Sequence, residues 1–203
     1  MKDPDAAKVG RAWSNRAIEM ALAHYPGFHM TSPPTEETAY AVYWPALIPS
    51  GMIEQLVHVG AREIAIPPTM SRAPDTAPAL PRSDAISPVP GGKTVRAPLG
   101  RVAGARSGDK GGNANVGVWV RTPEAYAWLR EFLTAERLRQ LLPEARGLEI
   151  ERHPLPNLLA VNFVIQRLLG DGVSASTRSD PQAKSLGEYL RARVVDVPET
   201  LLG

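Results

Sequence analysis

A glycine-rich polar stretch between two apolar segments constrains this chain more than any other part of it. Residues 104–117 hold five glycines among arginine, lysine, aspartate and asparagine residues, and they join the apolar runs 99–103 and 116–120. So many glycines indicate backbone conformations closed to other residues, or a close approach to another group. Arg106 and Lys110 add positive charge beside exposed N–H groups, an arrangement that binds anions. The stretch therefore predicts a wide binding loop.

The amino-acid composition indicates which classes of protein and of functional site this chain can belong to. Hydrophobic residues make up 43% of the 203 residues, and 23 basic against 21 acidic residues leave a formal net charge of only +2. That balance gives no support for a nucleic-acid partner. The chain has no cysteine, which excludes disulfides, thiolate metal sites and a cysteine nucleophile. Residues 1–5 are polar and no apolar run is long enough to span a membrane, so we expect a soluble cytoplasmic protein without a membrane partner.

Proline divides the chain into two parts. Residues 70–96 are rich in proline and poor in large apolar residues, which is typical of a semi-rigid linker. Before it, residues 1–69 predict a helix that Asp3 caps, an irregular stretch over 28–55 and two strands, 56–59 and 63–66. This first part is a short, incomplete α/β segment.

Residues 97–203 predict a compact α+β domain. Its expected strands are 99–103, 116–121, 148–153, 173–178 and 194–197. Its expected helices are 122–142, which Thr122 caps, 158–169, whose apolar run also fits a strand, and 180–189.

The glycine-rich stretch matches no common catalytic loop. It lacks the spacing and the hydroxyl of a phosphate-binding Walker loop, and a strand rather than a helix follows it, unlike a dinucleotide-binding motif. Ser107 is one place away from the position of a nucleophile elbow. Two alternatives remain, an anion-binding loop or a structural loop whose Asp109 and asparagines bond their own backbone.

We take the polar residues of this stretch as the candidate site. Asp109 and Lys110 are the candidate acid–base pair, although such neighbours are also common in surface turns. A second segment, Ser174–Asp180 with Lys184, places hydroxyls and an arginine before an expected helix, where Asp180 is alternatively a plain N-cap. The candidate ligand-binding residues are Arg106, Ser107, Gly108, Gly111, Gly112, Asn113, Asn115, Arg178, Asp180 and Lys184. The four histidines are scattered without metal-ligand spacing, so we expect no metal site.

These motifs resemble those of the acyclic terpene utilisation (AtuA-type) family. The matching motifs are Ala105–Gly111, Asn115–Gly117, Leu155–Leu158 with Asn162-Phe163, Gly170 and Gly172, and Asp180 with Lys184 and Leu186-Gly187. The resemblance covers residues 97–198 and implies a ferredoxin-like sandwich for the domain at 97–203. In that family the domain follows a much larger one, and residues 5–66 resemble only the tail of that larger domain.

The family is associated with the catabolism of acyclic terpenoids such as citronellol and of related branched acyl-CoA compounds. The resemblance implies a subunit or accessory component of such catabolism. Together with the charge and form of the glycine-rich loop, it favours binding of the phosphate or carboxylate of a CoA ester, with no separate cofactor. An acyl-CoA lyase or hydrolase component is the candidate enzyme class, and the reaction itself is left open. The alternative is a non-catalytic assembly module. In either case we expect a homo-oligomer, or a partner chain that carries the larger AtuA-type domain.

Overall fold

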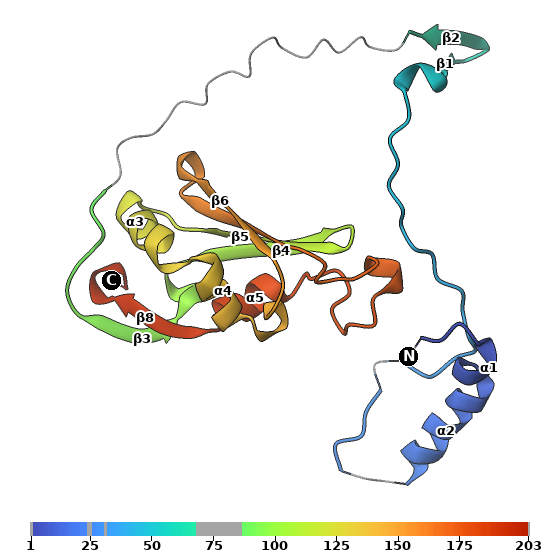
Figure 1. The fold of residues 1–203 in the computed structure, drawn as a ribbon, viewed down its shortest axis with the longest axis horizontal. Coiled ribbons are helices and arrows are strands. Elements are labelled where there is room, and N and C mark those ends of the chain that lie inside the picture. The colour runs from blue at the N-terminus through green and yellow to red at the C-terminus, as the bar shows by residue number, and fades with distance from the viewer. Residues whose placement is uncertain (1, 24–25, 31, 68–86, 203) are drawn as a thin grey trace. The chain divides into compact units, whose positions relative to one another are not determined.

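The computed structural model describes residues 2–23, 26–30, 32–67 and 87–202, and Figure 1 traces them. Contacts group residues 44–85 as one unit and the remaining residues as another. The proline-rich linker that the sequence predicts over 70–96 lies mostly outside the described residues.

The first helix that the sequence predicts is divided in two. Asp5, rather than Asp3, caps α1 (Ala6–Val9) and accepts a hydrogen bond from the first-turn backbone. A break at Gly10 separates it from α2 (Arg11–Leu22). Glycine suits this position, because a Cβ at residue 10 would overlap the carboxylate of Glu37.

Residues 50–66 form a short 3-10 turn, Ser50–Met52, and a hairpin. Its strands β1 (Gln55–Val59) and β2 (Arg62–Ile66) pair in the antiparallel sense, close to the ranges that the sequence predicts. Every residue of both strands is exposed, so this hairpin has no core of its own.

Four antiparallel strands form the main sheet of the C-terminal part, in the order β4-β5-β7-β6. Their bounds are β4 (Gly104–Lys110), β5 (Asn113–Trp119), β6 (Ile150–Leu155) and β7 (Ala160–Ile165). β5 and β6 both pair antiparallel to β7, so they run parallel to each other on either side of it. The helices α3 (Pro123–Phe132) and α4 (Ala135–Leu141) connect them, which makes a split βαβ unit.

The core lies on one face of this sheet. Alternate residues of β5 and β7 are buried, with Val116, Phe163 and Ile165 fully so, as the two-residue period of a strand requires. α3, α4 and α5 (Leu186–Arg191) pack on that face, against β7, β6 and β4 respectively. The opposite face of the sheet, which we call the open face, carries the strand residues that alternate with the buried ones.

A second, two-stranded sheet closes the C-terminal part. β3 (Thr94–Pro98) pairs antiparallel to β8 (Val194–Pro198), and the latter is close to the strand that the sequence predicts. The strand predicted over 99–103 is wrong, because the chain turns there through a 3-10 helix, Leu99–Arg101, after the pairing with β8 has ended.

Three other sequence predictions are wrong in this part. The helix predicted over 158–169 is the strand β7, and the one over 122–142 is the two helices α3 and α4, capped by Thr122 and Thr134. The strand predicted over 173–178 is a 3-10 turn, since Gly170 and Gly172 bend the chain with φ of +60° and +100°. Mixed helices and antiparallel strands nevertheless confirm the predicted α+β class.

Candidate functional site

The glycine-rich stretch forms a tight β-hairpin, so the wide loop predicted from its sequence is wrong. β4 and β5 pair along their whole length, which leaves only Gly111 and Gly112 in the turn. Gly111 has a φ of +61°, the left-handed conformation that such a two-residue turn demands. Ala105 in β4 and Ala114 in β5 are buried, each on the core face of its strand. Because these residues are small and stand among glycines, the alternation of buried and exposed residues is hard to recognise in the sequence.

Two glycines of this hairpin serve packing. A Cβ at Gly104 would overlap the indole of Trp119, its partner across the strands. A Cβ at Gly112 would overlap the carbonyl oxygen of Gly170, and the Gly112 carbonyl accepts a hydrogen bond from the Leu169 N–H at 2.9 Å. The hairpin tip is therefore fixed against the turn that follows β7.

Ser107 joins the two candidate segments of the sequence. Its buried hydroxyl accepts a hydrogen bond from the Gly187 N–H at 2.8 Å and donates one to the Lys184 carbonyl at 3.2 Å. Gly187 permits this contact, because a Cβ there would lie only 3.3 Å from the backbone of Arg106. Residues about 80 positions apart in the sequence thus meet at the outer edge of β4.

Asp180 shapes the segment that carries Lys184. Its carboxylate accepts hydrogen bonds from the N–H groups of Lys184 and Ser185, both at 2.9 Å, and from the Ser185 hydroxyl at 2.6 Å. Burial acts to raise the pKa of Asp180, but the bonds from Ser185 and Lys184 and the charge of Arg178 outweigh it and lower that pKa. Asp180 therefore caps a turn, and the helix predicted from it begins only at Leu186.

A small cleft lies at this edge of the sheet. We call it the edge cleft, and its volume is about 240 Å³. Arg106 and Lys184 stand beside it, both exposed, and neither side chain forms an ion pair with a described residue. The Lys184 ammonium lies 3.5 Å from the place that a Cβ on Gly108 would take. The residues that line the edge cleft are Ala105, Arg106, Ser107, Lys184, Gly187 and Glu188.

Comparison with known families identifies this part of the chain. Residues 97–196 match the family model of the AtuA ferredoxin-like domain. This part of the chain is an AtuA ferredoxin-like domain. No curated protein and no solved structure matches the chain. The resemblance stated from the sequence motifs is thereby confirmed for this domain, together with its ferredoxin-like fold.

The AtuA ferredoxin-like domain places an additional strand at one edge of its sheet. The split βαβ unit of β5, α3, α4 and β6 around β7 is half of a ferredoxin-like arrangement. The edge beside β5 is taken by β4, which precedes it in the chain, while β8 after α5 pairs with β3. The edge cleft therefore lies where α5 crosses this additional strand.

The proposed acid–base pair does not share one face of the domain. Asp109 and Lys110 are consecutive in β4, so their side chains point to opposite faces of the sheet. The Lys110 ammonium donates to the backbone carbonyl of Asp109 at 2.9 Å and not to its carboxylate. Neither residue lines the edge cleft.

The two candidate asparagines make hydrogen bonds within the domain. The Asn113 side-chain oxygen accepts from the Arg167 N–H at 2.9 Å and so secures the end of β7. The Asn115 amide donates to the side-chain oxygen of Asn162 at 3.0 Å, between β5 and β7 on the open face. Both asparagines therefore lie away from the edge cleft.

Arg178 lies beside a separate cleft of about 370 Å³, which Asp180, Ser185, Glu144 and Tyr189 also line. Its Nε is buried without a hydrogen-bond partner among the described residues. The structure thus divides the candidate residues of the second segment between two neighbouring clefts, with Lys184 at one and Arg178 at the other.

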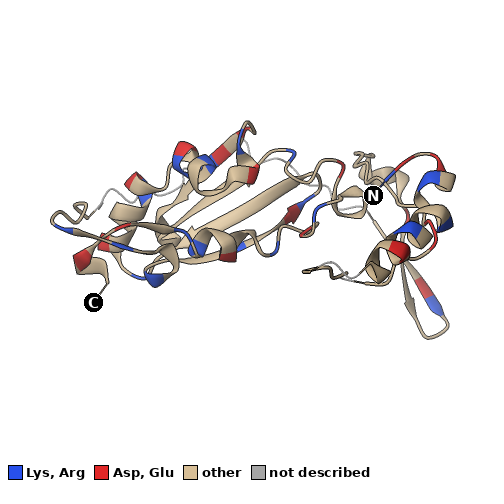
Figure 2. Cartoon of the chain, turned by 90° about the horizontal axis from the view of Figure 1, so that it is seen from below, with Lys and Arg blue, Asp and Glu red and all other residues tan. Residues whose placement is uncertain are grey.

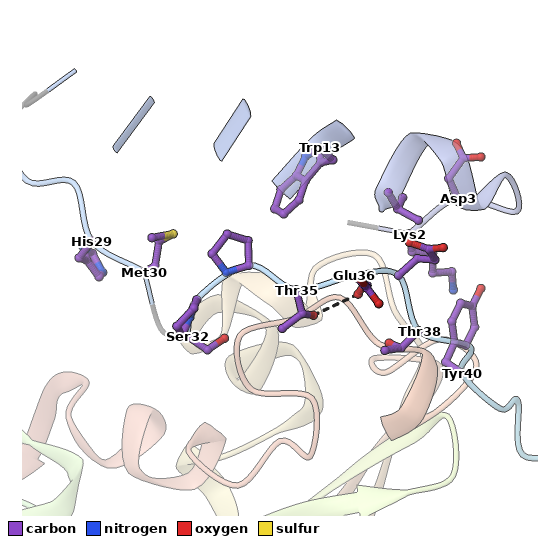
Figure 3. Close-up of a pocket in the computed structure, with 14 residues that line it drawn as sticks. Lys2, Asp3, Trp13, His29, Met30, Ser32, Thr35, Glu36, Thr38 and Tyr40 are labelled. Atoms are coloured by element: carbon purple, nitrogen blue, oxygen red, sulfur yellow. Dashed lines mark hydrogen bonds between the residues drawn. The ribbon is translucent and has the colours of Figure 1, made fainter. Parts of the chain in front are cut away.

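The N-terminal segment has a larger hollow of about 540 Å³, which Figure 3 shows between α2 and the chain at residues 29–30 and 32–40. Trp13 projects from α2 over it, and the Ser14 hydroxyl secures the extended chain by donating to the Thr35 carbonyl. Arg11 and Glu36 add an exposed ion pair at 2.6 Å. Lys2, Asp3 and, in α1, Val9 also line this hollow, and it contains none of the candidate residues.

One residue of the edge cleft has no signal in the sequence. Glu188 lines the cleft and forms an ion pair with Arg191 at 2.7 Å, but it lies in an ordinary helical stretch. Only the packing of α5 on β4 reveals it. Within the described part of the chain, no cluster of three or more histidine or acidic residues is arranged to bind a metal ion. The described helices include none that is long and apolar enough to cross a membrane.

The lowered pKa of Asp180 predicts a pH dependence of stability. Its contribution is present above the ordinary aspartate value of 3.8 and is lost as the pH falls below that value through the lowered pKa. We expect Asp180→Asn to reduce the melting temperature at pH 7 and to flatten its decline as the pH falls below about 4. Thermal unfolding measured over this range tests it, with Asp196→Asn on the exposed side of β8 as the control. Parallel pH profiles for wild type and Asp180→Asn would contradict the assignment.

Proposed function

We propose that this chain is a component of acyclic terpenoid or related branched acyl-CoA catabolism, and that the edge cleft binds the carboxylate or phosphate of its ligand. The observation that carries the proposal is the meeting of Arg106 and Lys184, from two distant segments, at one cleft without ion-pair partners in the described residues. The association of the AtuA family with such catabolism supports the substrate class. The proposal concerns binding and assigns no bond-breaking step.

The size and charge of the cleft support an anionic group as the occupant. A volume of about 240 Å³ accommodates a carboxylate or a phosphate group rather than a whole CoA molecule. An arginine and a lysine both donate charge-assisted hydrogen bonds to such groups. The Ser107 bonds hold together the two backbone segments that carry these cations.

Titration calorimetry with a branched acyl-CoA, free CoA, the free branched acid and inorganic phosphate tests the proposal. We expect Arg106→Ala and Lys184→Ala each to weaken binding about tenfold or more, since a hydrogen bond to a charged group contributes roughly 1.5–3 kcal/mol. Added salt is expected to weaken binding further.

The matched controls are Arg96→Ala and Lys93→Ala, which remove the same charges at exposed positions outside the edge cleft. We expect both to bind as wild type does. Equal affinities for all four variants, or no binding of any of the four probes by wild type, would rule the edge cleft out as the ligand site.

A second candidate function is that of an assembly module. Within the described part of residues 2–67, only Gly10 and Ser14 are buried. Trp44 and Leu22 are 86% and 69% exposed, and the apolar residues of β1 and β2 are all exposed. A segment with this much exposed apolar surface is completed by a partner, which we propose is a chain carrying the larger AtuA-type domain.

Hydrogen exchange tests the second candidate. Mixed with a chain carrying the larger AtuA-type domain, the amides of residues 55–66 are expected to exchange more slowly than in the isolated protein. Unchanged exchange at saturating partner would exclude docking through this segment.

A further inference from the structure

A further cleft of the C-terminal domain lies at the end of the main sheet, where β4 begins and β5 ends. We call it the end cleft, and its volume is about 930 Å³. Its walls are the 3-10 turns Leu99–Arg101 and Glu199–Leu201, the starts of β4 and α3, and α5. Small-molecule sites in proteins have volumes of about 300–1,000 Å³. The end cleft therefore has room for a whole small molecule, whereas the edge cleft has room only for one of its groups.

Arginines give the end cleft a positive charge. Arg101, Arg121 and Arg191 line it, and the only acidic residue among its described lining residues is Glu188. Glu188 already forms the ion pair with Arg191, whereas Arg101 and Arg121 are exposed and have no ion-pair partner in the described part of the chain. Figure 2 shows acidic and basic residues intermingled over the protein, so this imbalance is local to the cleft. Guanidinium groups bind phosphates through paired, charge-assisted hydrogen bonds.

Trp119 supplies an aromatic surface to the same cleft. It is 42% exposed, and on one side its indole lies so close to β4 that a Cβ at Gly104 would overlap it. The backbone of β4 thus supports the ring while the rest of it stays accessible. Arg121 follows Trp119 by two residues, so a cation and an aromatic ring reach the cleft from neighbouring positions. An accessible aromatic ring beside cations favours a ligand that combines a planar base with phosphate groups.

The end cleft and the edge cleft adjoin each other, because Ala105 and Glu188 line both. Arg106 and Lys184, the cations of the edge cleft, therefore continue the positive charge of the end cleft. Together with the two unpaired arginines they make four cations without an acidic partner among the described residues, in a chain whose formal net charge is only +2. A groove with this charge suits a ligand that carries more than one negative charge.

We propose that the end cleft binds a nucleotide, whose base stacks on Trp119 and whose phosphates are bound by the arginines of this cleft and by the cations of the edge cleft. The inference rests on the proposed function in its last part, since it takes the edge cleft as a phosphate site. Two ligands share this chemistry, a free nucleoside diphosphate and the nucleotide portion of a CoA thioester. No other part of the ligand is assigned a place.

Titration calorimetry of the full chain with ADP and with pyrophosphate tests the role of the base. We expect wild type to bind ADP more tightly than pyrophosphate, because only ADP can stack on Trp119. Trp119→Leu keeps an apolar side chain beside Gly104 and is expected to raise the dissociation constant for ADP at least about fivefold, with that for pyrophosphate unchanged. The control Trp44→Leu alters a residue that is 86% exposed and outside both clefts, and it should bind as wild type does.

Arg121→Ala tests the phosphate contacts at an exposed position where the fold is expected to tolerate the change. It is expected to raise the dissociation constants for ADP and pyrophosphate about tenfold each. Arg146→Ala removes the same charge at an exposed position outside both clefts and is expected to change neither. Should Trp119→Leu fail to fold, this pair of variants and the preference of wild type for ADP over pyrophosphate decide the matter.

Titration with CoA identifies the source of the nucleotide: tighter binding of CoA than of ADP assigns the cleft to a CoA thioester, and weaker or equal binding assigns it to a free nucleotide. ADP bound no more tightly than pyrophosphate, or affinities that Trp119→Leu and Arg121→Ala leave unchanged, would overturn the inference. The proposed function would still stand if Arg106→Ala and Lys184→Ala weakened binding of the branched acid or phosphate. Conversely, ADP binding that depends on Trp119 and Arg121 alone would keep the end cleft as a nucleotide site and remove the edge cleft as a ligand site.

Discussion

Replacing Phe163 with alanine is expected to lower the free energy of unfolding of the C-terminal domain by about 3–5 kcal/mol. The Phe163 ring is fully buried at the centre of β7, where it packs with the helices on the core face. Truncation removes the transfer energy of the ring and leaves a cavity that the surrounding side chains fill only in part. Urea denaturation followed by circular dichroism measures the change.

Val164→Ala is the control for this prediction. Val164 is the next residue in β7 and lies on the open face, where it is only partly buried. We expect this substitution to lower the free energy of unfolding by about 1 kcal/mol or less. A large loss of stability at Phe163 with a small one at Val164 is expected for a strand whose residues alternate between a buried and an open face. Similar losses at both positions would contradict this alternation in β7.

The second large effect is expected at Ser107. Ser107→Ala removes the acceptor of the Gly187 N–H and the donor to the Lys184 carbonyl. A buried N–H left without a partner costs roughly 1–3 kcal/mol, so we expect a loss of stability of that size. The Gly187 amide should also exchange with solvent faster, because the link that holds α5 to β4 is gone.

Ser174→Ala is the matched control, since that hydroxyl is on an exposed residue of the neighbouring turn. It is expected to change stability by no more than about 0.5 kcal/mol. A Ser107→Ala variant as stable as Ser174→Ala, with unchanged exchange at Gly187, would show that the two segments are held together by other contacts.

The sequence predicts the elements whose signals are local. Thr122 followed by a proline marks the start of α3 correctly, because capping involves only adjacent residues. The helix predicted over residues 158–169 is wrong, since a continuous apolar run fits either a helix or a buried strand. Pairing with β6 on one side and with β5, which is distant in sequence, on the other decides that this segment alternates between two faces.

The candidate site, too, combines features that have a local signal in the sequence with features that have none. The glycines and cations of residues 104–117 identify an important region, but their number suggested a loop where the structure has a hairpin. The contact of Ser107 with Gly187 depends on how α5 crosses β4, which no local pattern encodes. Glu188 enters the edge cleft for the same reason.

The pairing of β3 with β8 has a mechanical consequence. Thr94 lies opposite Pro198, so the two ends of the C-terminal domain leave the small sheet at the same side. A pulling force applied through these two ends acts across the strands, so the hydrogen bonds between β3 and β8 break one after another. In the shear geometry they would all bear the force together. Under tension the ladder of β3 and β8 is therefore expected to open first at the two ends of the domain.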